Sequence, residues 1–186
     1  SNLYAGTYLV TITDNNGDVI DTSFVITEPI APLSFSTSQV NVSCYGGTGS
    51  ITVVDAGGTG TKQYSKDGGI TYQPSTTFNA LLAGAYQISV KDFNNCIAAT
   101  QTVTLTQPAL LSFTYTQTNA NCAGTATGSI MITTTGGSGT KQYSKDNGIT
   151  FKSSSIFNNL VSGDYLVLVK DANNCLTTAQ TVTITE

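Results

Sequence analysis

Four cysteines carry the side chains best suited to covalent chemistry: Cys44, Cys96, Cys122 and Cys175. Four cysteines allow three disulfide connectivities. Because each of two sequence copies holds two of them at corresponding positions, we expect pairing within each copy, Cys44 with Cys96 and Cys122 with Cys175. Such bonds persist outside the reducing cytosol. Free thiols are one alternative and a metal site another, although two cysteines per copy without histidine are a poor set of zinc ligands.

Oxygen ligands alternate in the segment that contains Asp14, Asn16 and Asp18. We expect no cofactor; calcium is the alternative, because such alternation resembles part of a calcium-binding loop. The segment lacks the glycine and the bidentate glutamate of a complete EF-hand loop. A hairpin turn stabilised by the aspartate side chain explains the same pattern without a metal.

Four aromatic side chains lie at corresponding places in the two copies: Tyr64, Tyr72, Tyr143 and Phe151. They form a candidate platform for stacking against sugar rings of a surface polysaccharide. Packing in a hydrophobic core is the competing explanation for at least one residue of each pair, and tryptophan is absent.

The residue types that are missing limit the chemistry further. The chain has no histidine and no arginine, and its formal net charge is −4. Without histidine there is no imidazole base for a serine or cysteine nucleophile, so we expect no enzyme. An acidic chain without arginine is poorly suited to bind nucleic acid. No apolar run approaches the roughly 18 residues that a membrane span needs, so we expect no membrane insertion by this segment.

The elements that position these residues come in copies. The segment 58–67 recurs as 137–146 with nine of ten residues identical, 79 residues later. The opening segment 3–8 resembles 81–86, and Asp18 stands where Cys96 stands in the next copy. A self-similarity of this kind is typical of tandem arrays.

The predicted organisation is therefore one partial and two complete repeats. Residues 1–29 form the C-terminal hairpin of a preceding partial repeat, followed by repeats at 30–108 and 109–186. In this interpretation the chain is a window on a longer array, with neighbouring repeats as its partners. The alternative is a permuted domain whose opening hairpin belongs to the repeat that follows.

Each repeat has the pattern of an all-β domain. Apolar residues alternate with polar ones, as in 86–90 and 165–169, and Asp-Gly, Asn-Gly and Asn-Asn pairs separate the runs. About seven short strands per 79 residues predict tandem β-sandwiches of the immunoglobulin or fibronectin type III class. Tyr86 and Tyr165, each following a glycine by two residues, fit the tyrosine corner of that class.

The succession of motifs also indicates a family. In the first complete repeat, Cys44 and two glycines are followed by the segment 63–69, Phe78, the segment 82–86 and the segment 90–96. This order resembles the SprB-type repeats of very large cell-surface adhesins of Bacteroidetes. The chain departs from the pattern at Asp18, which replaces a cysteine, and after Cys122, where one extra residue is inserted.

The resemblance implies an extracellular location on the cell surface, with export by the type IX secretion system and association with the outer membrane through the parent protein. It also implies a non-catalytic structural segment of an adhesin filament that serves adhesion and, in gliding members, motility. The rival hypothesis is a carbohydrate-binding module that recognises surface polysaccharide through exposed tyrosines.

Overall fold

The computed structural model describes residues 3–186, and every regular element in that range is a β-strand. Two compact units divide the chain. The first comprises Ser1–Thr37, Val53–Thr76 and Gln87–Gln101, and the second comprises Ser38–Thr52, Thr77–Tyr86 and Thr102–Glu186. The repeat boundaries given above are a different division, and they stay a prediction.

An antiparallel hairpin of two strands, β1 (Gly6–Thr13) and β2 (Val19–Ile26), opens the chain. Its register runs from Gly6 opposite Ile26 to Thr13 opposite Val19. The hairpin forms because alternating threonine and apolar residues suit extended backbone, and because the turn between its strands is rich in aspartate, asparagine and glycine.

The next six strands build two three-stranded sheets. They are β3 (Ser34–Val40), β4 (Gly49–Ala56), β5 (Gln63–Ser65), β6 (Thr77–Leu81), β7 (Gly84–Lys91) and β8 (Gln101–Leu105). The strand orders are β3-β4-β6 and β5-β7-β8. In the second unit β4 pairs with β6 from Gly49 to Thr52, with a register shift between Gly49 and Ile51. In the first unit β5 pairs with β7 from Gln63 to Ser65.

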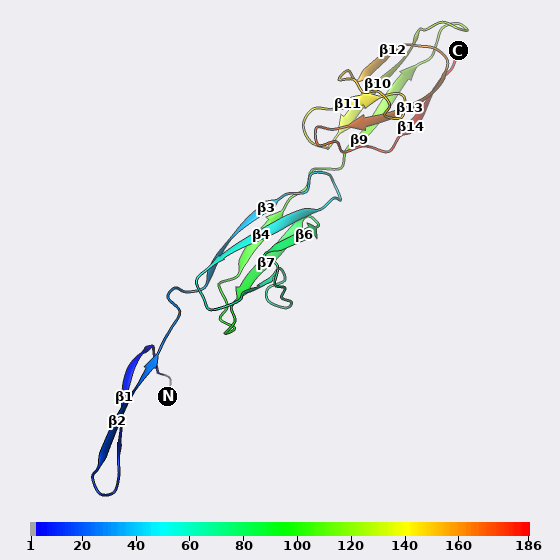
Figure 1. The fold of residues 1–186 in the computed structure, drawn as a ribbon. Helices are drawn as coiled ribbons and strands as arrows, with labels where there is room; N and C mark the ends of the chain where they lie inside the picture. Colours follow the sequence, from blue (N-terminus) through cyan, green and yellow to red (C-terminus); the bar gives the residue numbers. More distant parts are fainter. Residues whose placement is uncertain (1–2) are drawn as a thin grey trace. The chain divides into compact units, whose positions relative to one another are not determined.

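The last six strands form a complete sandwich in the second unit (Figure 1). They are β9 (Ser112–Thr118), β10 (Gly128–Thr135), β11 (Gln142–Ser144), β12 (Ile156–Leu160), β13 (Gly163–Lys170) and β14 (Gln180–Ile184). The sheets have the orders β12-β10-β9 and β11-β13-β14. Ile130 from the first sheet and Val167, Val169 and Val182 from the second are fully buried in one core. Burying each side chain contributes about 1.5–3 kcal/mol.

Glycine is required where the chain leaves β10. Gly136 has φ 70°, in the left-handed region, and a Cβ at this position would collide with the carbonyl oxygen of Leu110. The neighbouring N–H of Gly137 donates to the carbonyl of Ala109 at 2.9 Å. These contacts fix the segment that enters the sandwich against the end of β10.

The structure confirms the predicted fold class, an all-β protein with β-sandwich repeats. It also confirms the tyrosine corners, because the hydroxyl of Tyr86 donates to the carbonyl of Leu82 at 2.9 Å and that of Tyr165 donates to Val161 at 3.0 Å. In the opening hairpin the hydroxyl of Tyr8 reaches back four residues in the same way, at 2.8 Å.

Candidate functional site

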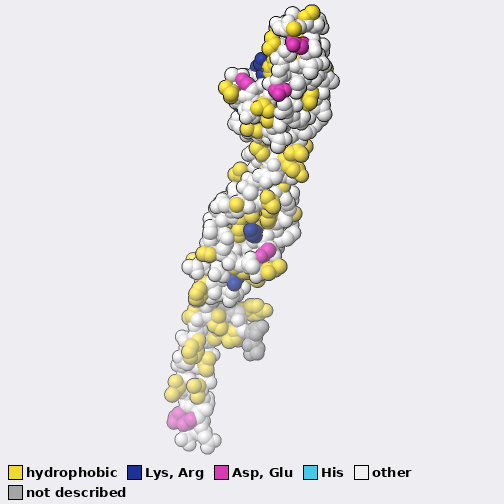
Figure 2. Space-filling view, turned by 90° about the vertical axis from the view of Figure 1, so that its right-hand side faces the viewer, with side chains coloured by type: hydrophobic (Ala, Val, Ile, Leu, Met, Phe, Trp, Pro, Cys, Tyr) yellow, Lys and Arg dark blue, Asp and Glu magenta, His cyan; other side chains and the backbone are white. Residues whose placement is uncertain are grey.

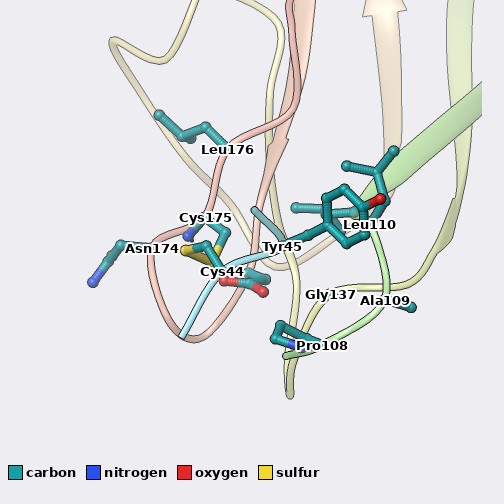
Figure 3. Close-up of a pocket in the computed structure, with 11 residues that line it drawn as sticks. Cys44, Tyr45, Pro108, Ala109, Leu110, Gly137, Asn174, Cys175 and Leu176 are labelled. Carbon is teal, nitrogen blue, oxygen red and sulfur yellow. Dashed lines mark hydrogen bonds between the residues drawn. A yellow bond between two sulfur atoms is a disulfide. The ribbon is translucent and has the colours of Figure 1, made fainter. Parts of the chain in front are cut away.

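A disulfide joins Cys44 to Cys175 within the second unit (Figure 3). The two Cα atoms are 5.6 Å apart, and 131 residues separate the cysteines in the sequence. Cys96 and Cys122 are exposed free thiols. The expected pairing of Cys44 with Cys96 and of Cys122 with Cys175 is therefore wrong.

Strand direction explains why the expected pairing fails. Gly128, the first residue of β10, pairs with Leu160, and β13 begins at Gly163 immediately afterwards. Both strands therefore start at the same end of the sandwich. Cys122 precedes β10 whereas Cys175 follows β13, so the two cysteines lie at opposite ends of strands about 24 Å long. A disulfide needs its Cα atoms within about 7 Å.

The turn that carries Cys175 is built around a buried carboxylate. Asp171 is 3% exposed and accepts hydrogen bonds from the backbone N–H groups of Ser138 (2.7 Å), Asn173 (2.9 Å) and Cys175 (3.0 Å). Burial works to raise the pKa of Asp171, but these N–H donors and the charge of Lys141 outweigh it, so the pKa lies below its ordinary value of 3.8. The ionised side chain thereby fixes the position of the cysteine.

Cys44 lies in a tight turn that faces this carboxylate-centred turn. The N–H of Gly47 donates to the carbonyl of Cys44 at 3.0 Å, and the N–H of Gly46 donates to the side-chain oxygen of Gln107 at 2.9 Å. Across the disulfide, the amide of Asn173 donates to the carbonyl of Ser43 at 2.9 Å. The covalent bond is thus accompanied by a polar contact between the same two turns.

A cavity of about 290 Å³ lies beside the disulfide. Figure 3 shows the ring of Tyr45 on one side of the sulfur atoms with Leu110 close by, Asn174 on the other side and Leu176 above them. The cavity's only charged side chain is Asp171, whose carboxylate already accepts three backbone hydrogen bonds. The arrangement is suited to joining two turns covalently.

The aromatic platform expected from Tyr64, Tyr72, Tyr143 and Phe151 is not exposed as one surface. Tyr64 is 6% exposed, and its hydroxyl donates to Asp55 at 2.5 Å. Burial, followed by the hydrogen bond and the charge of Asp55, raises the pKa of Tyr64 to about 12. Tyr143 packs against the core of the sandwich. Core packing explains these two residues.

Tyr72 and Phe151 are half-buried, and a lysine lies over each ring. The ammonium of Lys91 is 4.4 Å from the centre of the Tyr72 ring, and that of Lys170 is 4.3 Å from the centre of the Phe151 ring. Each ammonium thereby covers one face of its ring, and that face is closed to a stacked sugar.

A serine–aspartate–threonine network beside these rings was not expected from the sequence. In the second copy, the hydroxyl of buried Ser144 donates to Asp146 and accepts the N–H of Gly148 at 2.8 Å. Both the hydroxyl and the N–H of Thr150 donate to Asp146. The Thr150 donors, assisted by Ser144, lower the pKa of Asp146 to about 2. The sequence feature that could have indicated this network is the Ser-x-Asp-x-x-x-Thr spacing, which is present in both copies.

Asp14, Asn16 and Asp18 form a hairpin turn. The side chain of Asp14 accepts the N–H groups of Asn16 (2.8 Å) and Asp18 (3.0 Å). Asp92 and Asp171 bond their own turns in the same way, so this geometry matches the alternative to the calcium loop. Among residues 3–186 the structure contains no cluster of three or more acidic, cysteine or histidine side chains that could hold a metal.

Charged side chains are sparse and scattered on the face shown in Figure 2. This distribution follows from a chain with seven lysines and eleven acidic residues in 186. In the part of the chain that the structure describes, no helix is long and apolar enough to span a membrane.

Comparison with known proteins identifies an SprB repeat at residues 114–150, which confirms the resemblance stated above. The matched segment runs from β9 through β11 of the complete sandwich. It supports an extracellular structural repeat. No curated protein sequence matches the chain.

Among solved structures, the chain is similar to the crystal structure of the S-layer protein SbsC, domains 7, 8 and 9. The sequence identity is 13% and the TM-score is 0.30, with 97% of this chain and 69% of that chain covered.

Proposed function

We propose that this chain is a non-catalytic structural segment of a long extracellular bacterial adhesin filament, displayed on the cell surface for adhesion and gliding motility. The observation that carries the proposal is the SprB repeat at residues 114–150, whose motifs recur in the preceding copy. The type IX secretion route and the attachment to the outer membrane through the parent protein are parts of the same proposal.

The disulfide between Cys44 and Cys175 supports a filament role. It links a turn that precedes β4 to a turn that follows β13, and with the repeat boundaries proposed here it bridges two successive repeats covalently. A bond of this kind stabilises a tandem array against separation of its members, and it persists in an oxidising extracellular setting.

Surface labelling of the source bacterium tests the proposal. Antibodies raised against the purified chain are added to intact cells, and fluorescence is followed over time. We expect labelling without permeabilisation and, on gliding cells, fluorescent spots that travel along the cell. The control is an antibody against a periplasmic protein, which must stain only permeabilised cells. Staining that requires permeabilisation would contradict surface display, and stationary spots on gliding cells would contradict the motility part.

The opening hairpin supports the tandem-array interpretation, with residues 1–29 as the end of a preceding repeat. Ile12 and Phe24 are 60% and 57% exposed. By the same register, they correspond to Val169 and Val182, which are fully buried in the sandwich core. The exposure of these apolar residues, whose counterparts are buried in a sandwich core, supports the proposed assignment of the hairpin to a preceding repeat.

Hydrogen exchange on the intact chain tests this assignment. An isolated two-stranded hairpin is only marginally stable in water. We expect the amides of β1 and β2 to exchange close to the rate of an unfolded chain, whereas those of β13 and β14 are protected at least a hundredfold more. Equal protection in both pairs of strands would show that the hairpin is a self-sufficient element.

A further inference from the structure

The bonded turn at Cys175 has an unbonded counterpart at Cys96. In both, the aspartate four residues earlier accepts the cysteine N–H, at 2.9 Å for Cys96 and 3.0 Å for Cys175. In both, the N–H of that aspartate donates to the cysteine carbonyl at 3.0 Å. The turn at Cys96 therefore already has the conformation of the turn that holds a disulfide.

A cavity lies beside Cys96 at the position of the cavity beside the disulfide. Its volume is about 460 Å³, and its walls include Gly58, Asp92 and Ile97. These residues are the counterparts of Gly137, Asp171 and Leu176 around the disulfide. The bonded cavity is also lined by Cys44 and Tyr45, which belong to the tight turn that begins at Cys44. Among residues 3–186, the lining of the cavity at Cys96 includes no turn of this kind.

The turn at Cys122 is the counterpart of the disulfide-bonded turn at Cys44. It has the shape of the bonded Cys44 turn, because the N–H of Thr125 donates to the carbonyl of Cys122 at 3.0 Å and Gly124 has the same φ of 74° as Gly46. The N–H of Gly124 donates to the side chain of Glu186 at 3.3 Å, as that of Gly46 does to Gln107.

We propose that Cys96 and Cys122 are the two unpaired halves of the inter-repeat disulfide that Cys44 and Cys175 form. Cys96 is the acceptor for a Cys44-type turn of a preceding repeat, and Cys122 inserts into the Cys96-type cavity of a following repeat. The occupant of each site is thus another repeat of this type. The inference rests on the tandem-array function proposed above, but it concerns linkage alone and not adhesion.

The bond forms by thiol–disulfide exchange. Two thiols become one disulfide, and the two electrons and two protons that they lose reduce the disulfide of an extracytoplasmic oxidant, a dithiol oxidoreductase or a small-molecule disulfide, to two thiols. The attacking species at each step is a thiolate, and both cysteines are exposed enough for that attack.

A peptide probe tests the acceptor site. The probe has the sequence of residues 41–47, with its cysteine held as a mixed disulfide with 5-thio-2-nitrobenzoate. Attack by a protein thiolate on the peptide sulfur releases the coloured aromatic thiolate. The rates are measured on the Cys122→Ser chain, where Cys96 is the free thiol, and on the Cys96→Ser chain, and each is divided by the rate with a small aromatic disulfide.

We expect the normalised rate to be at least tenfold higher at Cys96 than at Cys122. A peptide of reversed sequence should lose the preference, and Asn94→Ala should weaken it severalfold, because Asn94 is the counterpart of the Asn173 that contacts the bonded turn. Equal normalised rates at the two cysteines would overturn the assignment of Cys96 as an acceptor.

An extended chain tests the other half. A second copy of residues 108–186 is joined after Glu186. Cys122 is then followed by a repeat that contains the Cys175 turn, which forms the disulfide with Cys44. After refolding with oxidised and reduced glutathione, peptides are mapped without reduction. We expect Cys122 to be bonded to the added copy of Cys175. Finding Cys122 free where Cys44–Cys175 has formed would overturn the proposal, while the surface labelling described above would stand unaffected.

Discussion

Tyr64 and Tyr143 occupy the same place in the two copies, but their surroundings differ. Tyr64 is buried and donates to Asp55, whereas the residue 79 positions after Asp55 is Thr134 and Tyr143 is only half-buried. One residue after each tyrosine, Ser65 and Ser144 make the same hydrogen bonds at distances within 0.1 Å. The repeat therefore retains the turn network and varies the partner of the aromatic ring.

We expect the largest loss of stability from replacing a glycine that both copies require. We expect Gly136→Ala to lower the free energy of unfolding by about 3 kcal/mol, because left-handed backbone costs a residue with a Cβ about 1–2 kcal/mol and the collision with the carbonyl of Leu110 adds to it. Gly57→Ala should behave alike, since its Cβ would meet the carbonyl of Pro32. The measurement is urea unfolding followed by circular dichroism.

Gly124→Ala is the matched control for this pair. Gly124 has φ 74°, but no atom lies within 4 Å of the added Cβ. Its cost should be that of the backbone alone, about 1 kcal/mol. If Gly124→Ala lowered the free energy of unfolding as much as Gly136→Ala, the collision with the carbonyl of Leu110 would not contribute to the loss.

The shared serine should have the next largest effect. Ser65→Ala and Ser144→Ala each leave two backbone N–H groups of a partly buried turn without the buried serine oxygen that accepts them. Leaving such groups unpaired lowers stability by about 2 kcal/mol, and the loss should be the same in both copies. Unequal losses in the two variants, measured by the same unfolding experiment, would contradict the equivalence of this turn in the two copies.

Removing the tyrosine hydroxyl should change the free energy of unfolding differently in the two copies. We expect Tyr64→Phe to lower the free energy of unfolding by about 1.5 kcal/mol, because it removes a hydrogen bond to a carboxylate. Tyr143→Phe should change stability by less than about 0.5 kcal/mol. Equal effects in the two variants would show that Asp55 does not distinguish the copies.

Alkaline titration should give the smallest but most specific signal. The pKa of Tyr64 is raised from 10.0 to about 12 in the folded chain, so its contribution to stability is complete below pH 10 and is lost as the pH rises to about 12. Ultraviolet absorbance of tyrosinate should show one late-ionising tyrosine that Tyr64→Phe removes. In Asp55→Asn this tyrosine should ionise earlier, and an unchanged titration would remove Asp55 as a cause.

The sequence predicted the strands, the turns and the tyrosine corners because these depend on local patterns. Alternation around Tyr86 and Tyr165 and the Asn-Asn turns specify extended segments and their connections without reference to distant residues. The repeat itself was visible as identity between segments. The fold class followed from these features alone.

The disulfide could not be predicted in the same way. Identical cysteines in successive copies are compatible with bonds inside a copy and with bonds between copies, since both give each cysteine the same surroundings. Deciding between them requires knowing at which end of the sandwich each turn lies. That depends on the strand pairing of Gly128 with Leu160, a long-range contact that the sequence pattern does not specify.

Burial of Tyr64 was equally non-local. Its position one residue before a buried serine is compatible with an exposed ring or a core ring, and the hydrogen bond to Asp55 decides between them. That partner lies in the preceding strand, nine residues away. A strand residue's exposure therefore could not be derived from the motif that contains it.

The bond between Cys44 and Cys175 also determines how the chain would transmit a pulling force. Tension applied at the two ends passes along the backbone to Cys44, crosses the sulfur atoms to Cys175 and continues from there. The 131-residue interval that the bond closes carries none of this load. About 450 Å of potential extension, at roughly 3.4 Å per residue, is thereby withheld, and most of the chain can stay folded while the ends are under stress.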